Sequence, residues 1–196
     1  MPVLGNIADR LIYGLTIPTT IRALVFNSTP TTTSPGPINN YYRRYVYKVI
    51  YTVAELQSAG WTKGMTIRRI SFYVTNQPTY QPYPSYTIGM INTASAVGSD
   101  ITAGWTTVRN AANISFTASQ ENIITLDTAF AWNGTSNLGI GFAWGQSPTN
   151  WSSSGVVESN TTGSARFAVT DGTGTYLLTD VASSTGTGRP AIRLYA

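Results

Sequence analysis

Apolar and polar positions alternate with a period of two through much of this chain, which is the pattern of β-strands. Residues 41–51 (YYRRYVYKVIY) and 67–75 (IRRISFYVT) show it most clearly, with aromatic and β-branched residues at every second position. Further short strands are expected at 86–90, 114–117, 122–126, 138–144, 156–159, 165–169, 176–178 and 191–195. Short strands separated by turn residues predict an all-β fold, a jelly-roll-like antiparallel β-sandwich.

One short helix is expected between the first two of these strands. Thr52 and Glu55 are three residues apart, which is the spacing of a capping box at a helix N-terminus. Gly60 follows at a position where many helices end in a left-handed residue. We therefore expect a helix over about 53–59.

The strand predicted at 138–144 has two unlike faces. Its even-numbered positions carry large apolar side chains, whereas Gly139, Gly141 and Ala143 leave the other face almost bare. Glycine within a strand marks a place where another part of the chain can approach closely. The bare face would therefore allow another layer to approach closely.

The chain divides at about residue 40. Residues 1–28 are apolar but contain the breakers Gly14 and Pro18, and 28–40 hold three prolines and many threonines. We interpret 1–40 as an extended N-terminal arm with a linker, and 41–196 as the sandwich domain. An extended apolar arm can add a strand to the sheet edge of a neighbour. The apolar arm residues expected to make this contact are Leu11, Ile12, Leu15, Ile17 and Leu24.

An ordered series of short segments resembles a β-sandwich domain of secreted and cell-surface proteins from Bacteroidetes-like bacteria. The segments, which span about 40–194, are YTVAEL (51–56), Gly60, IRRISFYV (67–74), YTIGM (86–90), Trp105, 123–138 and RPAIRL (189–194). The resemblance implies a jelly-roll-like module that is appended to adhesins and extracellular enzymes and is often suspected of binding glycans. Similar sandwiches occur in virion proteins. The chain departs from this pattern because it has its own 40-residue extension and no recognisable signal peptide at 1–10, and both departures favour a subunit of an assembly.

The composition argues against most enzyme classes. The sequence has no Cys and no His, and only 10% of its residues are charged. Nucleophile systems based on His or Cys and zinc sites are therefore excluded. We predict no catalytic residue, no metal and no cofactor. A hydrolase using carboxylates alone, with Glu121 or Glu158, is the enzymatic alternative. Asp171 and Asp180, which are flanked by Gly and Thr, are interpreted as turn residues rather than calcium ligands.

The charge pattern and hydropathy narrow the choice of partner. The net charge is +4, but the basic residues are scattered rather than gathered in a stripe, so we expect no nucleic-acid binding. No window reaches the roughly 18 apolar residues of a membrane span, so no membrane association is expected. Only Arg43, Arg44 and Lys48 lie close together. They are expected either to protect an edge strand from aggregation or to pair with carboxylates of a neighbour.

Aromatic residues in or beside two predicted loops are the candidate contact residues. These residues are Tyr80, Tyr83, Tyr86, Trp144 and Trp151. Flat rings beside amides and prolines suit both sugars and protein partners. The alternative is that these rings cap the open ends of the sandwich.

Taken together, the pattern favours a non-enzymatic structural subunit of an extracellular assembly. We expect a virion protein (a capsid decoration, fibre or capsid-associated protein) or a filament subunit, which contacts copies of itself and other virion proteins. It would be located in the virion or extracellular assembly. The alternative is a carbohydrate-binding or adhesion module whose partners are glycans.

Overall fold

The computed structural model describes residues 21–24, 31–33, 36–39, 41–76, 79, 81–145, 156–171 and 174–196. These residues form eleven strands and one helix. The elements are β1 (Ile21–Leu24), β2 (Thr31–Thr33), β3 (Arg44–Tyr51), α1 (Val53–Ser58), β4 (Thr66–Asn76), β5 (Tyr83–Thr93), β6 (Thr106–Ile114), β7 (Gln120–Ala131), β8 (Asn137–Trp144), β9 (Val156–Thr170), β10 (Ser184–Pro190) and β11 (Ile192–Tyr195).

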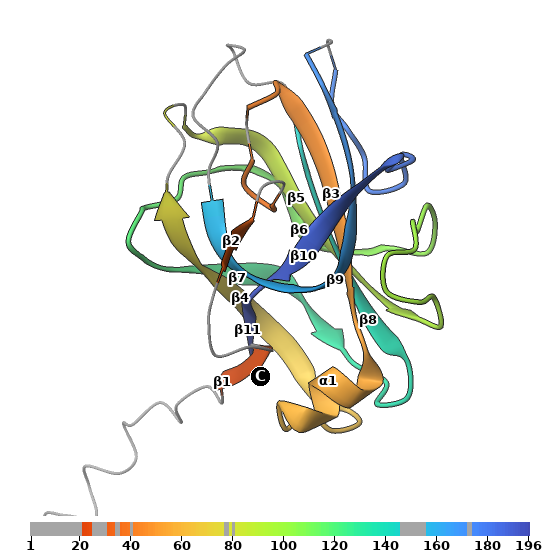
Figure 1. Ribbon diagram of the computed structural model, residues 1–196. Helices are drawn as coiled ribbons and strands as arrows, with labels where there is room; N and C mark the ends of the chain where they lie inside the picture. The colour runs from red at the N-terminus through yellow and green to blue at the C-terminus, as the bar shows by residue number, and fades with distance from the viewer. Residues whose placement is uncertain are drawn as a thin grey trace, which may run out of the picture.

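The strands form two antiparallel layers that pack face to face (Figure 1). The first layer has the order β6-β5-β8-β3-β9, and the second contains β7-β4-β11-β1. The long strand β9 belongs to both, because its first residues pair with β4 and β2 whereas its last residues pair with β3. Strand β10 pairs with the middle of β9. The prediction of an all-β antiparallel sandwich with one short helix is confirmed.

The core between the layers follows from the period-two pattern. Alternate residues of β3, from Tyr45 to Tyr51, point inward together with the even-numbered positions of β8. In the register, Tyr47 lies between Phe142 of β8 and Phe167 of β9. Burying rings of this size provides a large share of the hydrophobic stabilisation of a sandwich.

The helix is present and its capping box is complete. The Thr52 hydroxyl accepts a hydrogen bond from the Glu55 amide at 3.2 Å, and a Glu55 carboxylate oxygen accepts from the Thr52 amide at 2.7 Å. Gly60 adopts a positive φ of 84°, as expected for the residue that ends the helix. Glu55 also accepts two hydrogen bonds from the Arg189 guanidinium, which ties the helix to β10.

Part of the predicted arm belongs to the sandwich. Strand β1 pairs with β11 of the same chain, with Ile21 opposite Tyr195 and Leu24 opposite Ile192. Strand β2 pairs with β9 in the same way. The expectation that Leu24 joins a neighbour's sheet is therefore wrong for this structure, because its backbone already pairs within the chain. The other predicted arm residues, Leu11, Ile12, Leu15 and Ile17, lie outside the described residues.

Strand β3 lies in the middle of its layer, between β8 and β9. The prediction that Arg43, Arg44 and Lys48 protect an edge strand is wrong, since both edges of β3 are occupied by other strands. Lys48 forms an ion pair with Asp100 of the same chain, so its ammonium is not free to pair with a carboxylate of a neighbour. Within the described part of the chain, no helix is long and apolar enough to cross a membrane.

Candidate functional site

The outer face of the first layer carries a bare patch of three glycines, and two large side chains pack onto it. Gly89 of β5 and Gly139 and Gly141 of β8 form this patch, and Trp105 and Leu178 cover it. A Cβ atom on Gly141 would lie 2.8 Å from Leu178 Cδ2 and 3.2 Å from Trp105 Cη2. The close approach that the bare face of β8 allows is therefore used, by Trp105 and Leu178.

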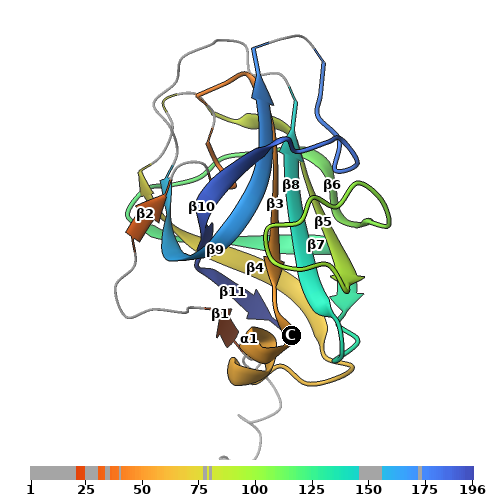
Figure 2. The same ribbon diagram turned by 45° about the vertical axis from the view of Figure 1, so that its right-hand side comes forward.

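Two connections supply this extra layer. The first, residues 94–105, joins β5 to β6 and ends with Trp105. The second, residues 174–183, precedes β10 and carries Leu178. Figure 2 shows the 94–105 connection, in green, passing over the face of β8 and β3. The layer is therefore made of loop residues on a rigid sheet, an arrangement that often carries binding sites.

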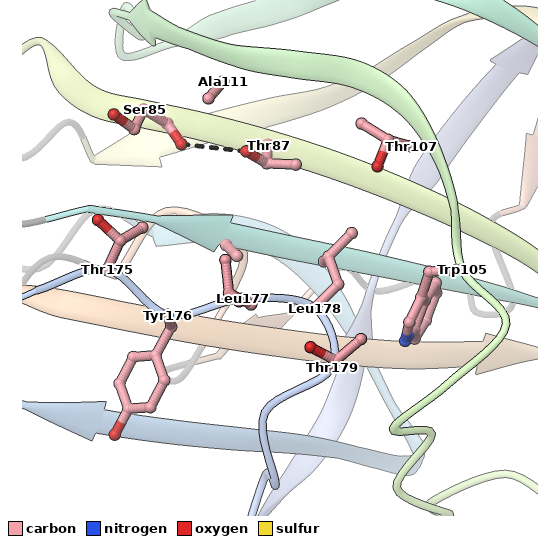
Figure 3. Close-up of a pocket in the computed structure, with 11 residues that line it drawn as sticks. Ser85, Thr87, Trp105, Thr107, Ala111, Thr175, Tyr176, Leu177, Leu178 and Thr179 are labelled. Carbon is pink, nitrogen blue, oxygen red and sulfur yellow. Dashed lines mark hydrogen bonds between the residues drawn. The ribbon is translucent and has the colours of Figure 1, made fainter.

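A pocket of about 470 Å³ lies between the 174–183 connection and the outer face of β5, β6 and β8 (Figure 3). We call it the outer-face pocket. The described lining residues bring hydroxyl groups, two aromatic residues and aliphatic groups, and none of them carries a carboxylate, an ammonium or a guanidinium group. The lining residues are Ser85, Thr87, Trp105, Thr107, Ala111, Ala143, Thr175, Tyr176, Leu177, Leu178 and Thr179.

The aromatic rings of the pocket are held in place by contacts outside it. The Trp105 indole Nε1 donates to the Ile101 carbonyl at 3.1 Å. The Arg44 guanidinium lies over the Tyr176 ring, 4.7 Å from its centroid, which is a cation–π contact. Both rings are thus positioned before any ligand binds, which lowers the entropic cost of binding.

A buried lysine fixes both connections beneath the pocket. The Lys48 ammonium donates to Asp100 Oδ1 at 2.7 Å, to the Ile101 carbonyl at 2.8 Å and to the Asp180 carbonyl at 2.6 Å. All three donors of the ammonium are used, and Lys48 is only 2% exposed. Burial lowers the pKa of Lys48, with an opposing contribution from Asp100 that is too small to cancel it.

Asp100 and Arg166 make further contacts with residues 182–185. The second carboxylate oxygen of Asp100 accepts from the Ala182 amide at 2.9 Å. Arg166 of β9, opposite Lys48 in the register, donates to the Ala182 carbonyl at 3.0 Å and to the Thr185 hydroxyl at 2.7 Å. We call the pair Lys48 and Asp100 the charged anchor, whereas Arg166 holds residues 182–185.

Three of the predicted contact residues are core residues. Tyr83, Tyr86 and Trp144 are 1%, 0% and 0% exposed and pack against one another. The Tyr86 hydroxyl donates to the Pro37 carbonyl at 2.9 Å, and the Tyr83 hydroxyl donates to the Ile38 carbonyl. Their prediction as ligand or subunit contacts is therefore wrong, because no part of these rings reaches the surface.

The remaining predicted contact residues, Tyr80 and Trp151, lie outside the described residues. Sequence reasoning missed Tyr176 and Leu178 as lining residues because it assigned 176–178 to a strand, whereas the structure has no strand there. Trp105 entered only through the resemblance. The signal that could have pointed to the pocket was the run of small residues in β8, which allows another layer to approach closely but does not identify it.

Glu121, the carboxylate considered for hydrolysis, belongs to a network between strands. It accepts hydrogen bonds from the Tyr195 hydroxyl at 2.6 Å and from the Ser71 hydroxyl, and the Arg193 guanidinium lies 3.8 Å away. Burial raises its pKa, but the two hydrogen bonds and Arg193 outweigh this effect and leave the pKa below its usual value. This carboxylate is therefore held ionised between β4, β7 and β11, where it joins strands.

The aspartates considered as turn residues have partners within the chain. The Asp180 carboxylate accepts from the Leu177 amide at 2.8 Å, and the Asp180 amide donates to the Leu177 carbonyl, which closes a turn. Asp171 accepts from the Arg43 amide at 3.4 Å. Among the residues that the structure describes, no cluster of three or more acidic side chains is suited to hold a metal ion. The Glu158 side chain lies outside the described part.

Comparison of the chain with protein-family models, with curated proteins and with solved structures finds no match.

Proposed function

We propose that this protein is a non-enzymatic binding module that takes a neutral carbohydrate in the outer-face pocket. The observation that carries the proposal is the lining, in which the Trp105 ring stands near five Ser and Thr hydroxyl side chains and no described lining residue is charged. Tyr176 also belongs to the lining, with its ring turned away from Ser85, Thr87 and Thr107 (Figure 3). Sugars present apolar C–H faces and a dense set of hydroxyl groups, so aromatic rings beside hydroxyls match both parts. The volume of about 470 Å³ falls within the range of small-molecule sites.

Further features support a carbohydrate over a charged ligand. Two charged groups beside the lining residues are engaged within the chain, since Lys48 is paired with Asp100 and the Arg44 guanidinium lies over the Tyr176 ring. A charged ligand would therefore enter a neutral site without a counter-ion. The resemblance to sandwich domains of adhesins, in which glycan binding is often suspected, favours the same conclusion.

The proposal is tested by titrating the protein with a panel of neutral mono- and disaccharides and measuring binding by calorimetry or NMR. Thr107→Val and Thr179→Val each remove one hydroxyl from the pocket while keeping the shape of the side chain. Each is expected to weaken binding about fivefold, since a hydrogen bond contributes about 1 kcal/mol. Thr125→Val on the exposed face of β7 is the matched control and should bind as the unchanged protein does.

A second result decides whether the rings take part. Trp105→Ala should abolish saccharide binding while the far-ultraviolet circular dichroism stays that of a β-protein. Full saccharide affinity in the Trp105 and threonine variants would refute the proposed site. The absence of binding across the whole panel would refute the proposed ligand class.

A structural subunit of an extracellular assembly is the second candidate. Two exposed aliphatic residues favour it: Leu177 is 58% exposed and Val181 is 66% exposed, and both belong to the 174–183 connection. Apolar side chains close together on a surface favour a protein partner. We propose that such contacts join copies of this chain, or join it to other virion proteins, in a jelly-roll-based virion or filament.

Sedimentation velocity over a range of concentrations tests the second candidate. We expect self-association that weakens when Leu177 and Val181 are both changed to Ser. Deleting residues 1–20, which leaves β1 in place, tests the contribution of the predicted arm. A protein that stays monomeric at every concentration would contradict assembly from copies of this chain.

A further inference from the structure

One buried cation holds both connections that form the walls of the outer-face pocket. Lys48 does not line the pocket, yet it contacts Asp100 and Ile101 of the 94–105 connection and Asp180 of the 174–183 connection. These partners are 52 to 132 residues from Lys48 along the chain. A single side chain therefore bridges two segments that are remote in sequence.

Asp100 joins the two connections a second time. One of its carboxylate oxygens pairs with Lys48, and the other accepts from the Ala182 amide of the 174–183 connection. Asp100 is 15% exposed, so water can replace these contacts only in part. When Lys48 or Asp100 is lost, the other is left with an unpaired charge at a site that both walls share.

Each wall carries a lining residue near its tether. The Ile101 carbonyl accepts from both Lys48 and the Trp105 indole, so the lysine and the ring share one anchoring atom. On the other wall, the turn closed between Leu177 and Asp180 contains Leu178 and Thr179, and Lys48 holds the Asp180 carbonyl at its end. A displacement at Lys48 would therefore reach the Trp105 ring and the Leu178–Thr179 turn together.

We propose that Lys48 and Asp100 make the two walls of the pocket one cooperative unit, with Lys48 as the positioning residue of a pocket that it does not touch. The walls order and loosen together rather than separately. Under the proposed carbohydrate-binding function, this coupling sets the affinity of the site, because a ligand that contacts Trp105 and Thr179 needs both walls in place.

Hydrogen exchange of the free protein, followed by mass spectrometry, tests the coupling without any ligand. In Lys48→Met we expect amides of both 98–105 and 176–183 to exchange at least about tenfold faster, since a charge-assisted hydrogen bond contributes that much or more. Asp100→Asn keeps the shape of the side chain and should loosen the same two segments. The double variant Lys48→Met/Asp100→Asn should be no looser than Lys48→Met alone, because both changes break one unit.

Arg166→Met is the matched control. Arg166 donates hydrogen bonds to residues 182, 183 and 185, so faster exchange should stay near 182–185. Faster exchange in only one of the two walls of Lys48→Met or Asp100→Asn would overturn the proposal, and so would unchanged exchange in both. Should Lys48→Met fail to fold, Asp100→Asn decides the matter alone.

Saccharide titration of the same variants separates this proposal from the proposed function. If a saccharide binds, Asp100→Asn should weaken it about tenfold although every lining residue is retained. If no saccharide binds even the unchanged protein, the proposed ligand is wrong, and the exchange data still decide whether the walls are coupled.

Discussion

Placing a methyl group on the bare patch of β8 tests directly how the extra layer packs. A Cβ at Gly141 would lie 2.8 Å from Leu178 Cδ2, and 3.2 and 3.3 Å from Trp105 Cη2 and Cζ3. Real Cβ contacts are not found as short as the first of these distances, so Gly141→Ala must displace the Leu178 side chain. Its end is flexible and one side of it faces the pocket, so the displacement is possible at a moderate cost.

The magnitude follows from two opposing contributions. Overpacking by one methyl group costs about 1–3 kcal/mol. Replacing glycine in a strand offsets about 0.5 kcal/mol of this cost by restricting the unfolded chain. We therefore expect Gly141→Ala to lower the free energy of unfolding by about 1–2 kcal/mol. Leu178→Ala should lower the free energy of unfolding by about 2 kcal/mol, near the low end for a buried leucine, because the Leu178 side chain adjoins the pocket.

The double variant Gly141→Ala/Leu178→Ala makes the test specific. Without the Leu178 side chain the closest contact disappears, and the new methyl group fills part of the space that is left. The two changes together should therefore cost about 2 kcal/mol instead of the sum of about 3–4 kcal/mol. The coupling of about 1–2 kcal/mol exceeds the deviation of about 0.5 kcal/mol expected for independent sites.

Urea denaturation, monitored by circular dichroism, gives the free energy of unfolding of all four proteins. Equal m-values would show that all four expose the same amount of surface on unfolding. Additive costs, within about 0.5 kcal/mol, would show that Leu178 does not rest on Gly141. The outer-face pocket would then be shaped differently from the arrangement described above.

Other parts of the structure give three further tests. Tyr86→Phe removes the donor to the Pro37 carbonyl in the core, so it should lower the free energy of unfolding by about 1–2 kcal/mol without affecting saccharide binding; unchanged stability would argue against that hydrogen bond. Burial raises the pKa of Glu55, but its hydrogen bonds from Arg189 and Thr52 outweigh this and leave the pKa lowered. Its contribution to stability is thus complete above the unfolded-state pKa of about 4.3 and is lost as the pH falls through the folded-state value, so Glu55→Gln should flatten the acid limb of a plot of unfolding free energy against pH. A limb of equal slope in both proteins would contradict that role. Lys48→Met should lower the free energy of unfolding by about 3 kcal/mol because it leaves Asp100 unpaired. Burial lowers the pKa of Lys48, so the unchanged protein should become more stable as the pH rises from the folded-state pKa of Lys48 to the unfolded-state pKa of about 10.4. The variant should lack this gain.

Local patterns predicted the elements whose residues decide their own structure. The alternation in 41–51 predicted β3, since every second side chain there enters the core. The capping box of Thr52 and Glu55 predicted α1 because its hydrogen bonds join residues three apart. Of strand β6, only the last residue, Ile114, fell in an expected strand (114–117), because β6 lies at the edge of its layer and most of its side chains face solvent, which removes the apolar alternation.

The pocket and the anchor could not be predicted in the same way. Tyr83 and Tyr86 looked like loop residues beside prolines, and only the carbonyls of Pro37 and Ile38, more than 40 residues away, show how their hydroxyls are satisfied inside the core. Lys48 looked like an exposed charge on an edge strand. Its burial depends on Asp100 and Asp180, which no spacing in the sequence connects with it.

The sequence by itself determined a two-layer β-sandwich, its short helix and a face of β8 bare enough for another layer to approach, because side-chain periodicity and capping act between near neighbours. Only the tertiary structure decided which loops provide that cover, that a lysine fixes them, and that the predicted aromatic contacts Tyr83, Tyr86 and Trp144 are core instead. Those outcomes depend on contacts between segments far apart in the chain, and the free energy of such contacts exists only once the two layers have assembled.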